Sequence, residues 1–234
     1  MSIKGISHIF FDLDHTIWDF DTNSKIAFEN MFHHHGLEQK LNTDFEQFHK
    51  AYLVHNLRYW DMYSRGEIDQ ADLRWKRMHE TLNEFAPSDE QSARSLSSTY
   101  LEHLPRNSHL FPGTIELLEY LTAKPYQLHI LSNGFEQTQA QKLKHSGIRQ
   151  YFNHVITSEA CQFIKPDKKI FEYAFQLCGT TPESCIMIGD SPEADLQGAI
   201  NAGIPSIYVD HADRATSIPY TFRVRTLIEI AQLL

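Results

Sequence analysis

The sequence predicts an α/β fold, a doubly wound parallel sheet with an all-helical insertion after its first strand. Three observations lead to this prediction. Residues 8–11 (HIFF) form a short apolar run that is typical of a strand buried on both faces. From residue 110 onward, strand-like runs alternate with helical ones, and this alternation indicates right-handed β-α-β units. Between residues 17 and 108 the apolar spacing is helical, and no segment is typical of a strand.

The insertion contains four predicted helices. Their apolar residues recur every three to four positions, and glycine or proline marks several of the breaks between them. The predicted helices span 23–35, 43–63, 69–85 and 89–104. We expect the chain to hinge at 17–22 and 105–112.

The segments after residue 110 are expected to complete the sheet and to cover it. The predicted strands are 126–131, 155–157, 184–188 and 207–209. The predicted helices are 112–121, 135–145, 170–178, 194–201 and a closing helix at 226–234. Residues 1–16 and 109–234 would then form one catalytic core, and residues 17–108 a separate helical domain.

Composition limits the classes of function. The chain has 234 residues, 41% of them hydrophobic, which is enough for a full core. Its 30 acidic and 21 basic residues give a net charge of -9, which argues against nucleic-acid polymers and anionic membranes as partners. No apolar run approaches the roughly 20 residues that span a bilayer. Cys161, Cys178 and Cys185 lack the C-x-x-C spacing of metal sites, so we expect reduced thiols in a cytoplasmic protein.

Acidic residues follow the first predicted strand at alternate positions. Asp12, Asp14 and Thr16 would share one side of an extended chain and converge past the carboxyl end of the strand. Two carboxylates this close raise each other's pKa unless a metal ion or a shared proton lies between them. The alternative is a strand end with solvated turn residues, because aspartate is common in turns.

Three further motifs also follow strand-like runs: LSNG at 131–134, KPD at 165–167 and GDSPEAD at 189–195. With Asp12, Asp14 and Thr16, this ordered set resembles the four-motif signature of phosphatases of the haloacid dehalogenase (HAD) superfamily. The resemblance implies a strand order of 5-4-1-2-3 and identifies the helical insertion as a cap domain. It also implies phosphoryl transfer as the reaction.

The resemblance assigns roles to the two aspartates of the first motif. Asp12 would be the nucleophile that forms an acyl phosphate. Asp14 would protonate the leaving alkoxide and later deprotonate the attacking water, although a simple place in the metal shell is the alternative. Haloacid dehalogenases lack an aspartate at the position of Asp14, so this residue favours phosphate chemistry over carbon–halogen cleavage.

Thr16 of the first motif would bind the phosphoryl group together with residues of the second and third motifs. The hydroxyls of Thr16 and Ser132 and the backbone N–H of Asn133 are expected to hold its oxygens, with turn capping as the alternative for the hydroxyls. Lys165 would neutralise both Asp12 and the transferred group, unless it is an ordinary exposed lysine.

The resemblance also implies a Mg²⁺ cofactor. Because Mg²⁺ takes few protein carboxylates, we expect Asp12, the backbone carbonyl of Asp14 and Asp190 as its ligands. Asp195 would orient a metal-bound water, or it could cap the following helix. His15 departs from the superfamily pattern, which often has Gly, Asn or Asp there, and it receives no catalytic role.

The substrate is expected to be a small phosphorylated metabolite. Among the aromatic residues of the insertion, Trp18 and Phe20 are the favoured pocket residues, and a stacking surface suits a nucleobase. The DxDxTxWDF run and the tail YxFRVRTLIEI are similar to bacterial house-cleaning 5'-nucleotidases that act on pyrimidine nucleoside monophosphates. The alternatives are a sugar-phosphate or phosphoglycolate-type phosphatase, a phosphotransferase or mutase, and a non-catalytic binding protein.

Overall fold

The computed structural model describes residues 5–234, and the first four residues of the predicted core segment 1–16 lie outside the described residues. The chain divides into two compact units. One is formed by Met1–Phe20 and Ser108–Leu234, and the other by Asp21–Asn107. Within the described residues, no helix is both long and apolar enough to cross a membrane.

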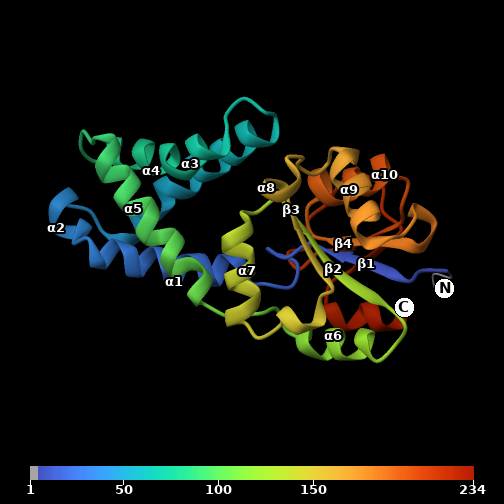
Figure 1. The fold of residues 1–234 in the computed structure, drawn as a ribbon. Helices are drawn as coiled ribbons and strands as arrows, with labels where there is room; N and C mark the ends of the chain where they lie inside the picture. Colours follow the sequence, from blue (N-terminus) through green and yellow to red (C-terminus); the bar gives the residue numbers. More distant parts are fainter. Residues whose placement is uncertain (1–4) are drawn as a thin grey trace. The chain divides into compact units, whose positions relative to one another are not determined.

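The first unit is built on a six-stranded sheet whose paired strands are all parallel (Figure 1). The predicted fold class is confirmed, because the predicted order 5-4-1-2-3 appears in the order β3-β2-β1-β4-β5-β6 read from the other edge. The sixth strand, a three-residue strand at one edge of the sheet, was not predicted. The strands are β1 (His8–Phe11), β2 (Gln127–Ser132), β3 (His154–Thr157), β4 (Cys185–Gly189), β5 (Ser206–Val209) and β6 (Phe222–Val224).

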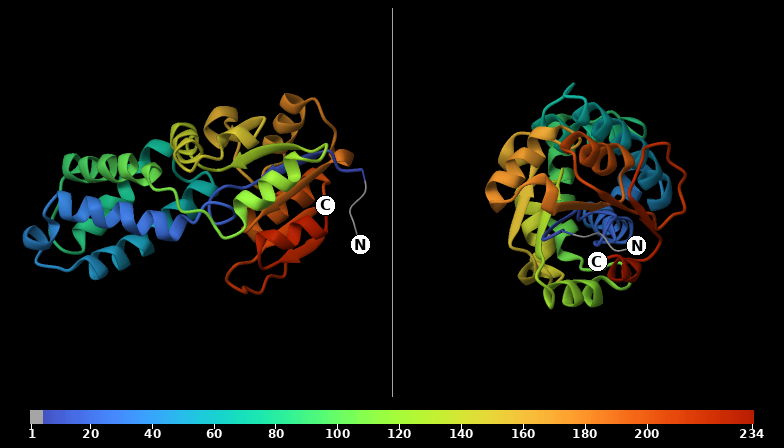
Figure 2. Two further views of the ribbon diagram at one scale, coloured as in Figure 1. Left: turned by 90° about the horizontal axis from the view of Figure 1, so that it is seen from below. Right: turned by 90° about the vertical axis from the view of Figure 1, so that its right-hand side faces the viewer.

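Helices cover both faces of this sheet. Figures 1 and 2 show α9 and α10 on one face and α6 with the C-terminal turn on the other. The predicted closing helix is instead a 3₁₀ helix, η5, which a capping box of Thr226 and Glu229 begins. The helices of this unit are α6 (Thr114–Thr122), α7 (Glu136–His145), α8 (Ser158–Cys161), α9 (Lys168–Cys178), α10 (Gln197–Ala202), the 3₁₀ turns η2 (Arg149–Tyr151), η3 (Pro182–Ser184) and η5 (Leu227–Gln232), and the π-helical turn η4 (Pro192–Leu196).

The core between β1, β2 and α9 explains why the strands read as continuous apolar runs. Phe10, Leu131 and Phe171 are fully buried there, in a cluster that also includes Met187 of β4. All four residues of β1 are buried, because both faces of the sheet are covered there, so HIFF does not alternate between core and solvent positions.

The described residues of the second unit form helices joined by turns and loops, with no strand among them (Figure 1). Its centre is aromatic: the ring of Phe28 lies 5.8 Å from that of Phe48, 4.2 Å from that of Tyr52 and 5.4 Å from that of Tyr100. The four predicted helices are present, and a short fifth one, α2, was not predicted. The helices are α1 (Phe20–His34), α2 (Leu37–Leu41), α3 (Phe45–Ser64), α4 (Gln70–Asn83), α5 (Glu90–His103) and the 3₁₀ turn η1 (Leu104–Arg106).

Candidate active site

Three buried aspartates meet at the carboxyl edge of the sheet. Asp12 directly follows β1, and its backbone N–H donates to the carbonyl of Ile188 in β4 at 2.8 Å. Asp190 directly follows β4, and Asp195 lies in the π-helical turn η4 behind it. One carboxylate oxygen from each aspartate lies within 4.8 Å of the other two. Parallel strands that end at one edge therefore bring together acids almost 180 residues apart in the chain.

Lys165 provides the buried positive charge in this cluster. Its Nζ lies 2.7 Å from Oδ1 of Asp12 and 2.6 Å from Oδ1 of Asp195, and its side chain is 2% exposed. The side chain of Asn133 holds the Lys165 backbone from both sides. The Lys165 N–H donates to Asn133 Oδ1 at 2.8 Å, and Asn133 Nδ2 donates to the Lys165 carbonyl at 3.0 Å. The sequence predicted that the backbone N–H of Asn133 contacts the phosphoryl group. It did not predict that the Asn133 side chain holds the Lys165 backbone.

The cluster carries more negative than positive charge. Burial raises the pKa of Asp12 to about 8, with Lys165 acting against this rise and Asp195 adding to it. Burial, followed by the charge of Asp195, raises the pKa of Asp190 to about 7. Burial alone would lower the pKa of Lys165, but Asp12 and Asp195 outweigh it and raise that pKa. Two cations face the three carboxylates: the buried Lys165 ammonium and the exposed guanidinium of Arg214, which lies 3.4 Å from Asp190 Oδ2. This leaves room for a further cation, and the all-oxygen donor set suits a hard divalent ion.

Asp195 has two partners that fix its carboxylate. Its Oδ1 contacts Lys165, and its Oδ2 accepts the backbone N–H of Ser191 at 3.0 Å. The turn itself is capped by Ser191, whose Oγ accepts the N–H of Ala194 at 3.1 Å. A Cβ on Gly189 would collide with the Asp195 carboxylate, so this position requires glycine. The fourth motif thus positions Asp195 against the lysine and uses serine as the cap.

Asp14 is held by helix α7, a contact that the motifs did not predict. Lys142 Nζ lies 2.6 Å from Asp14 Oδ1, and Gln139 Nε2 donates to Asp14 Oδ2 at 2.9 Å. The same Gln139 amide donates to the Oγ of Ser132 at 2.7 Å. Gln139 and Lys142 are three residues apart and buried, so they share one helix face. The sequence feature that could have indicated this contact is the pair of polar residues on an otherwise buried helix face.

Thr16 and His15 explain the turn that follows β1. The hydroxyl of Thr16 is buried and donates to Asp190 Oδ1 at 3.1 Å. His15 has a left-handed backbone with φ of 61°. Glycine and asparagine adopt this region most easily, and histidine is among the residues that tolerate it. The departure at His15 is therefore compatible with the left-handed backbone at this position.

The two predicted pocket aromatics pack around Lys142. Lys142 Nζ lies 4.4 Å from the ring centre of Trp18 and 5.2 Å from that of Phe20. Trp18 is fully buried, whereas Phe20 is half-buried. Of the two, Phe20 offers more of its ring to a ligand. Their contact with a substrate stays a prediction.

Comparisons with known proteins agree with this geometry. The chain is 31% identical over 219 residues to the pyrimidine 5'-nucleotidase PynA of Streptococcus pneumoniae, covering 92% of this chain and 90% of the relative. It is 30% identical over 229 residues to the pyrimidine 5'-nucleotidase YjjG of Escherichia coli, covering 97% of this chain and 96% of the relative. The predicted similarity to bacterial pyrimidine nucleotidases is thereby confirmed.

A solved structure has the same fold. The magnesium-bound crystal structure of the HAD-hydrolase YfnB from Bacillus subtilis matches with a TM-score of 0.88 and 26% identity, covering 98% of each chain. The family model described as haloacid dehalogenase-like hydrolase matches residues 6–203, which include all four motifs. The chain therefore belongs to the haloacid dehalogenase-like hydrolase family.

Proposed function

We propose that the protein is a Mg²⁺-dependent phosphomonoester hydrolase that uses Asp12 as its nucleophile. The observation that carries this proposal is the position of Lys165, whose buried ammonium contacts both Asp12 and Asp195. A carboxylate in contact with a fixed cation at a strand end can accept a phosphoryl group, because the ammonium offsets the repulsion between two anions.

The three aspartates fit a magnesium ion. Asp12, Asp190 and the backbone carbonyl of Asp14 would hold it, and Asp195 would act through Lys165 and a metal-bound water. When bound, the ion supplies positive charge to the phosphoryl oxygens and to the aspartates. The net negative charge of the cluster and the raised pKa values of Asp12 and Asp190 support this proposal.

The reaction proceeds in two displacements at phosphorus. An oxygen of Asp12 attacks, the bond to the leaving oxygen breaks, and Asp14 gives that oxygen a proton. The product is an acyl phosphate on Asp12. Asp14 then takes a proton from water as the water attacks phosphorus, which releases phosphate and restores the Asp12 carboxylate. Gln139 and Lys142 hold Asp14 in place for both proton transfers.

The proposed substrates are pyrimidine nucleoside 5'-monophosphates. The names of the relatives PynA and YjjG, each matched over at least nine-tenths of its length, support this choice. Phe20 is half-buried, and its ring centre lies 5.2 Å from Lys142 Nζ. It therefore offers an aromatic face on the side of the site where Asp14 lies. Bases stack on such faces with little dependence on their identity.

Two measurements test the proposal at separate levels. For the reaction, phosphate release from p-nitrophenyl phosphate is expected to require Mg²⁺ and to fall by about a thousandfold or more in Asp12→Asn. Activity that survives in the variant would reject Asp12 as the nucleophile. For the substrate, deoxyuridine and thymidine monophosphates are expected to give a higher kcat/KM than a panel of small sugar phosphates. Equal or better hydrolysis of sugar phosphates would reject the nucleotide assignment while leaving the reaction intact.

A further inference from the structure

Each of three neighbouring strands carries a histidine on the face covered by α9. His8 lies in β1, His129 in β2 and His154 in β3, and Cys178 ends α9 above them. His129 and His154 are direct register partners, so their side chains leave the sheet on the same side. Their rings stack at 5.4 Å, and the rings of His8 and His129 stack at 5.3 Å.

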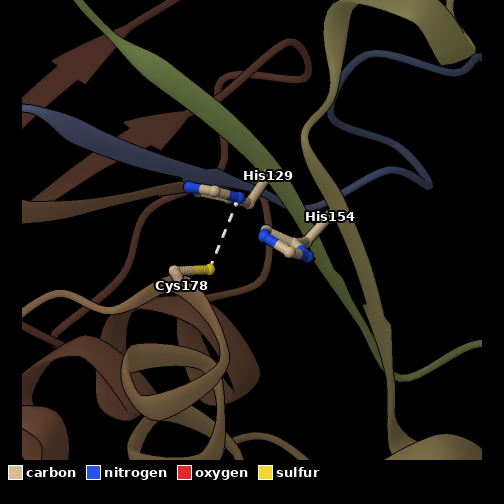
Figure 3. Close-up of side chains that lie close together, drawn as sticks. All are labelled: His129, His154 and Cys178. Carbon is tan, nitrogen blue, oxygen red and sulfur yellow. Dashed lines mark hydrogen bonds between the residues drawn. The ribbon is translucent and has the colours of Figure 1, made fainter.

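Two imidazoles and a thiol converge at one point in this arrangement (Figure 3). One ligand atom each from His129, His154 and Cys178 lies within 4.8 Å of the other two. Figure 3 shows a nitrogen of His154 turned toward the space between His129 and Cys178. These donors have neither a C-x-x-C spacing nor an i,i+4 histidine spacing in the sequence, because they come from three separate elements.

The distance between the donor atoms of Cys178 and His129 matches that in a tetrahedral metal site. Cys178 Sγ lies 3.5 Å from His129 Nδ1. Zinc binds sulfur at about 2.3 Å and imidazole nitrogen at about 2.0–2.1 Å, so two such ligands at a tetrahedral angle are about 3.5 Å apart. A thiol and an imidazole at this separation therefore need little movement to share an ion.

A second contact orients His129 for such a bond. Its Nε2 lies 3.1 Å from Nδ1 of His8, and both residues are buried. If His129 carries its proton on Nε2, it donates to His8 and leaves the Nδ1 lone pair directed at Cys178. A partner on the second ring nitrogen is the usual support for a metal-binding histidine.

We propose that His129, His154 and Cys178 form a second metal site, for a borderline-soft ion of the Zn²⁺ class, with the fourth position open to water. This site and the aspartate cluster are expected to bind different ions, because nitrogen and sulfur ligands favour zinc whereas carboxylates favour magnesium. His129 also lies three residues before Ser132, the last residue of β2, which corresponds to about 10 Å along the strand from the catalytic edge.

The surroundings of the site allow an ion to enter and bind. His154 and Cys178 are half-buried, so they give access to the buried His129. An ion binds the neutral imidazole of a histidine and the thiolate of a cysteine, so Cys178 must lose its thiol proton when the ion binds.

Cobalt is the probe for this site, because a thiolate bound to Co²⁺ gives a charge-transfer absorption that carboxylates do not. The full chain in excess Mg²⁺ is expected to develop this absorption with one equivalent of Co²⁺. Cys178→Ser is expected to abolish it, and His154→Asn to weaken Co²⁺ binding by at least tenfold. Cys161→Ser is the matched control, since Cys161 is a buried free thiol with its own contacts to Thr157 and Phe163. That variant is expected to bind Co²⁺ as the wild type does.

A measurement on the wild-type chain avoids any variant that fails to fold. Zn²⁺ in excess Mg²⁺ is expected to slow alkylation of Cys178 by iodoacetamide at least tenfold, measured by peptide mass spectrometry. The proposal is overturned if Co²⁺ gives no thiolate absorption with the wild type, if that absorption persists in a folded Cys178→Ser variant, or if Zn²⁺ leaves the alkylation rate unchanged. None of these readouts depends on phosphatase activity.

Discussion

Lys142 Nζ lies 2.6 Å from Asp14 Oδ1, which joins the proposed acid–base residue to helix α7. Burial lowers the pKa of Lys142, and Asp14 acts against this shift. The ammonium also packs on Trp18 and Phe20. Lys142 therefore links Asp14, the proposed proton-transfer residue, to the two aromatic residues that we expected near the leaving group.

Replacing Lys142 by methionine is expected to reduce turnover rather than substrate binding. The variant removes a contact that holds Asp14, and a small misplacement of a reacting group can cost about a hundredfold. We expect kcat to fall by about 10- to 100-fold, with a smaller change in KM, and Lys142→Arg to restore part of the loss. The exposed Lys144 provides the control Lys144→Met. Unchanged kcat in Lys142→Met would show that Lys142 does not position Asp14 for catalysis.

Gly134 is expected to tolerate no side chain because Gln139 fills the space beside it. A Cβ at this position would collide with the side-chain amide of Gln139. Gly134→Ala should therefore displace the amide from Ser132 and Asp14, lower kcat at least tenfold, and destabilise the fold by about 1–3 kcal/mol. The control is a double-mutant cycle measured by kcat and by the free energy of unfolding. If Gly134→Ala is as costly in a Gln139→Ala background as in the wild type, the clash is not the cause.

Mg²⁺ is expected to stabilise the protein through Asp190. An ion that binds the folded chain alone adds about 2.7 kcal/mol to the free energy of unfolding at a hundredfold excess over its Kd. Thermal unfolding should show a higher Tm with Mg²⁺ for the wild type and no such shift for Asp190→Asn. Glu172→Gln on the exposed face of α9 serves as the control and should keep the shift. An equal shift in Asp190→Asn would place the ion elsewhere.

His49 is expected to make the protein less stable in acid. Burial, followed by the charge of Lys25, lowers its folded-state pKa below the ordinary value of 6.5. Between these two pKa values the unfolded chain binds a proton that the folded chain does not, so the free energy of unfolding falls as pH falls. Its ring stacks on Phe45 at 5.3 Å, so His49→Phe can keep the packing.

The measurement is denaturant unfolding at about pH 7.5 and about pH 5.5, which lie on either side of the ordinary histidine pKa of about 6.5. His49→Phe should lose less stability over this interval than the wild type does. The control is His33→Gln, because His33 is exposed. A wild-type loss that the His49 variant retains in full would assign the acid sensitivity to other groups.

The sequence was sufficient for five of the six strands and for the acids at the edge of the sheet. Apolar strands followed by Asp12 and Asp190 predicted both the strand and the side chains at its end, because strand direction fixes where the next residues lie. Lys165 was predicted by its motif, and its contacts with Asp12 and Asp195 agree with the expected neutralising role. Catalysis by these residues stays a proposal that the experiments above test.

Contacts made by ordinary residues were not predictable from the sequence. Gln139 and Lys142 belong to no motif, and their place against Asp14 depends on how α7 packs beside β2. The cluster of His129, His154 and Cys178 was unpredictable for the same reason. Strand register and the position where α9 ends bring its donors together. Single histidines in three apolar strands were the available signal, and their meaning depends on which strands are neighbours.

The formation of a phosphoryl group on Asp12 tests the central claim most directly. The wild-type protein is mixed with a ³²P-labelled pyrimidine nucleoside monophosphate and Mg²⁺, quenched in acid within one turnover, and digested. We expect a hydroxylamine-labile label on the peptide that contains Asp12, and no label in Asp12→Asn. Phosphate release by the wild type with no label on this peptide, together with comparable release by Asp12→Asn, would contradict the central claim.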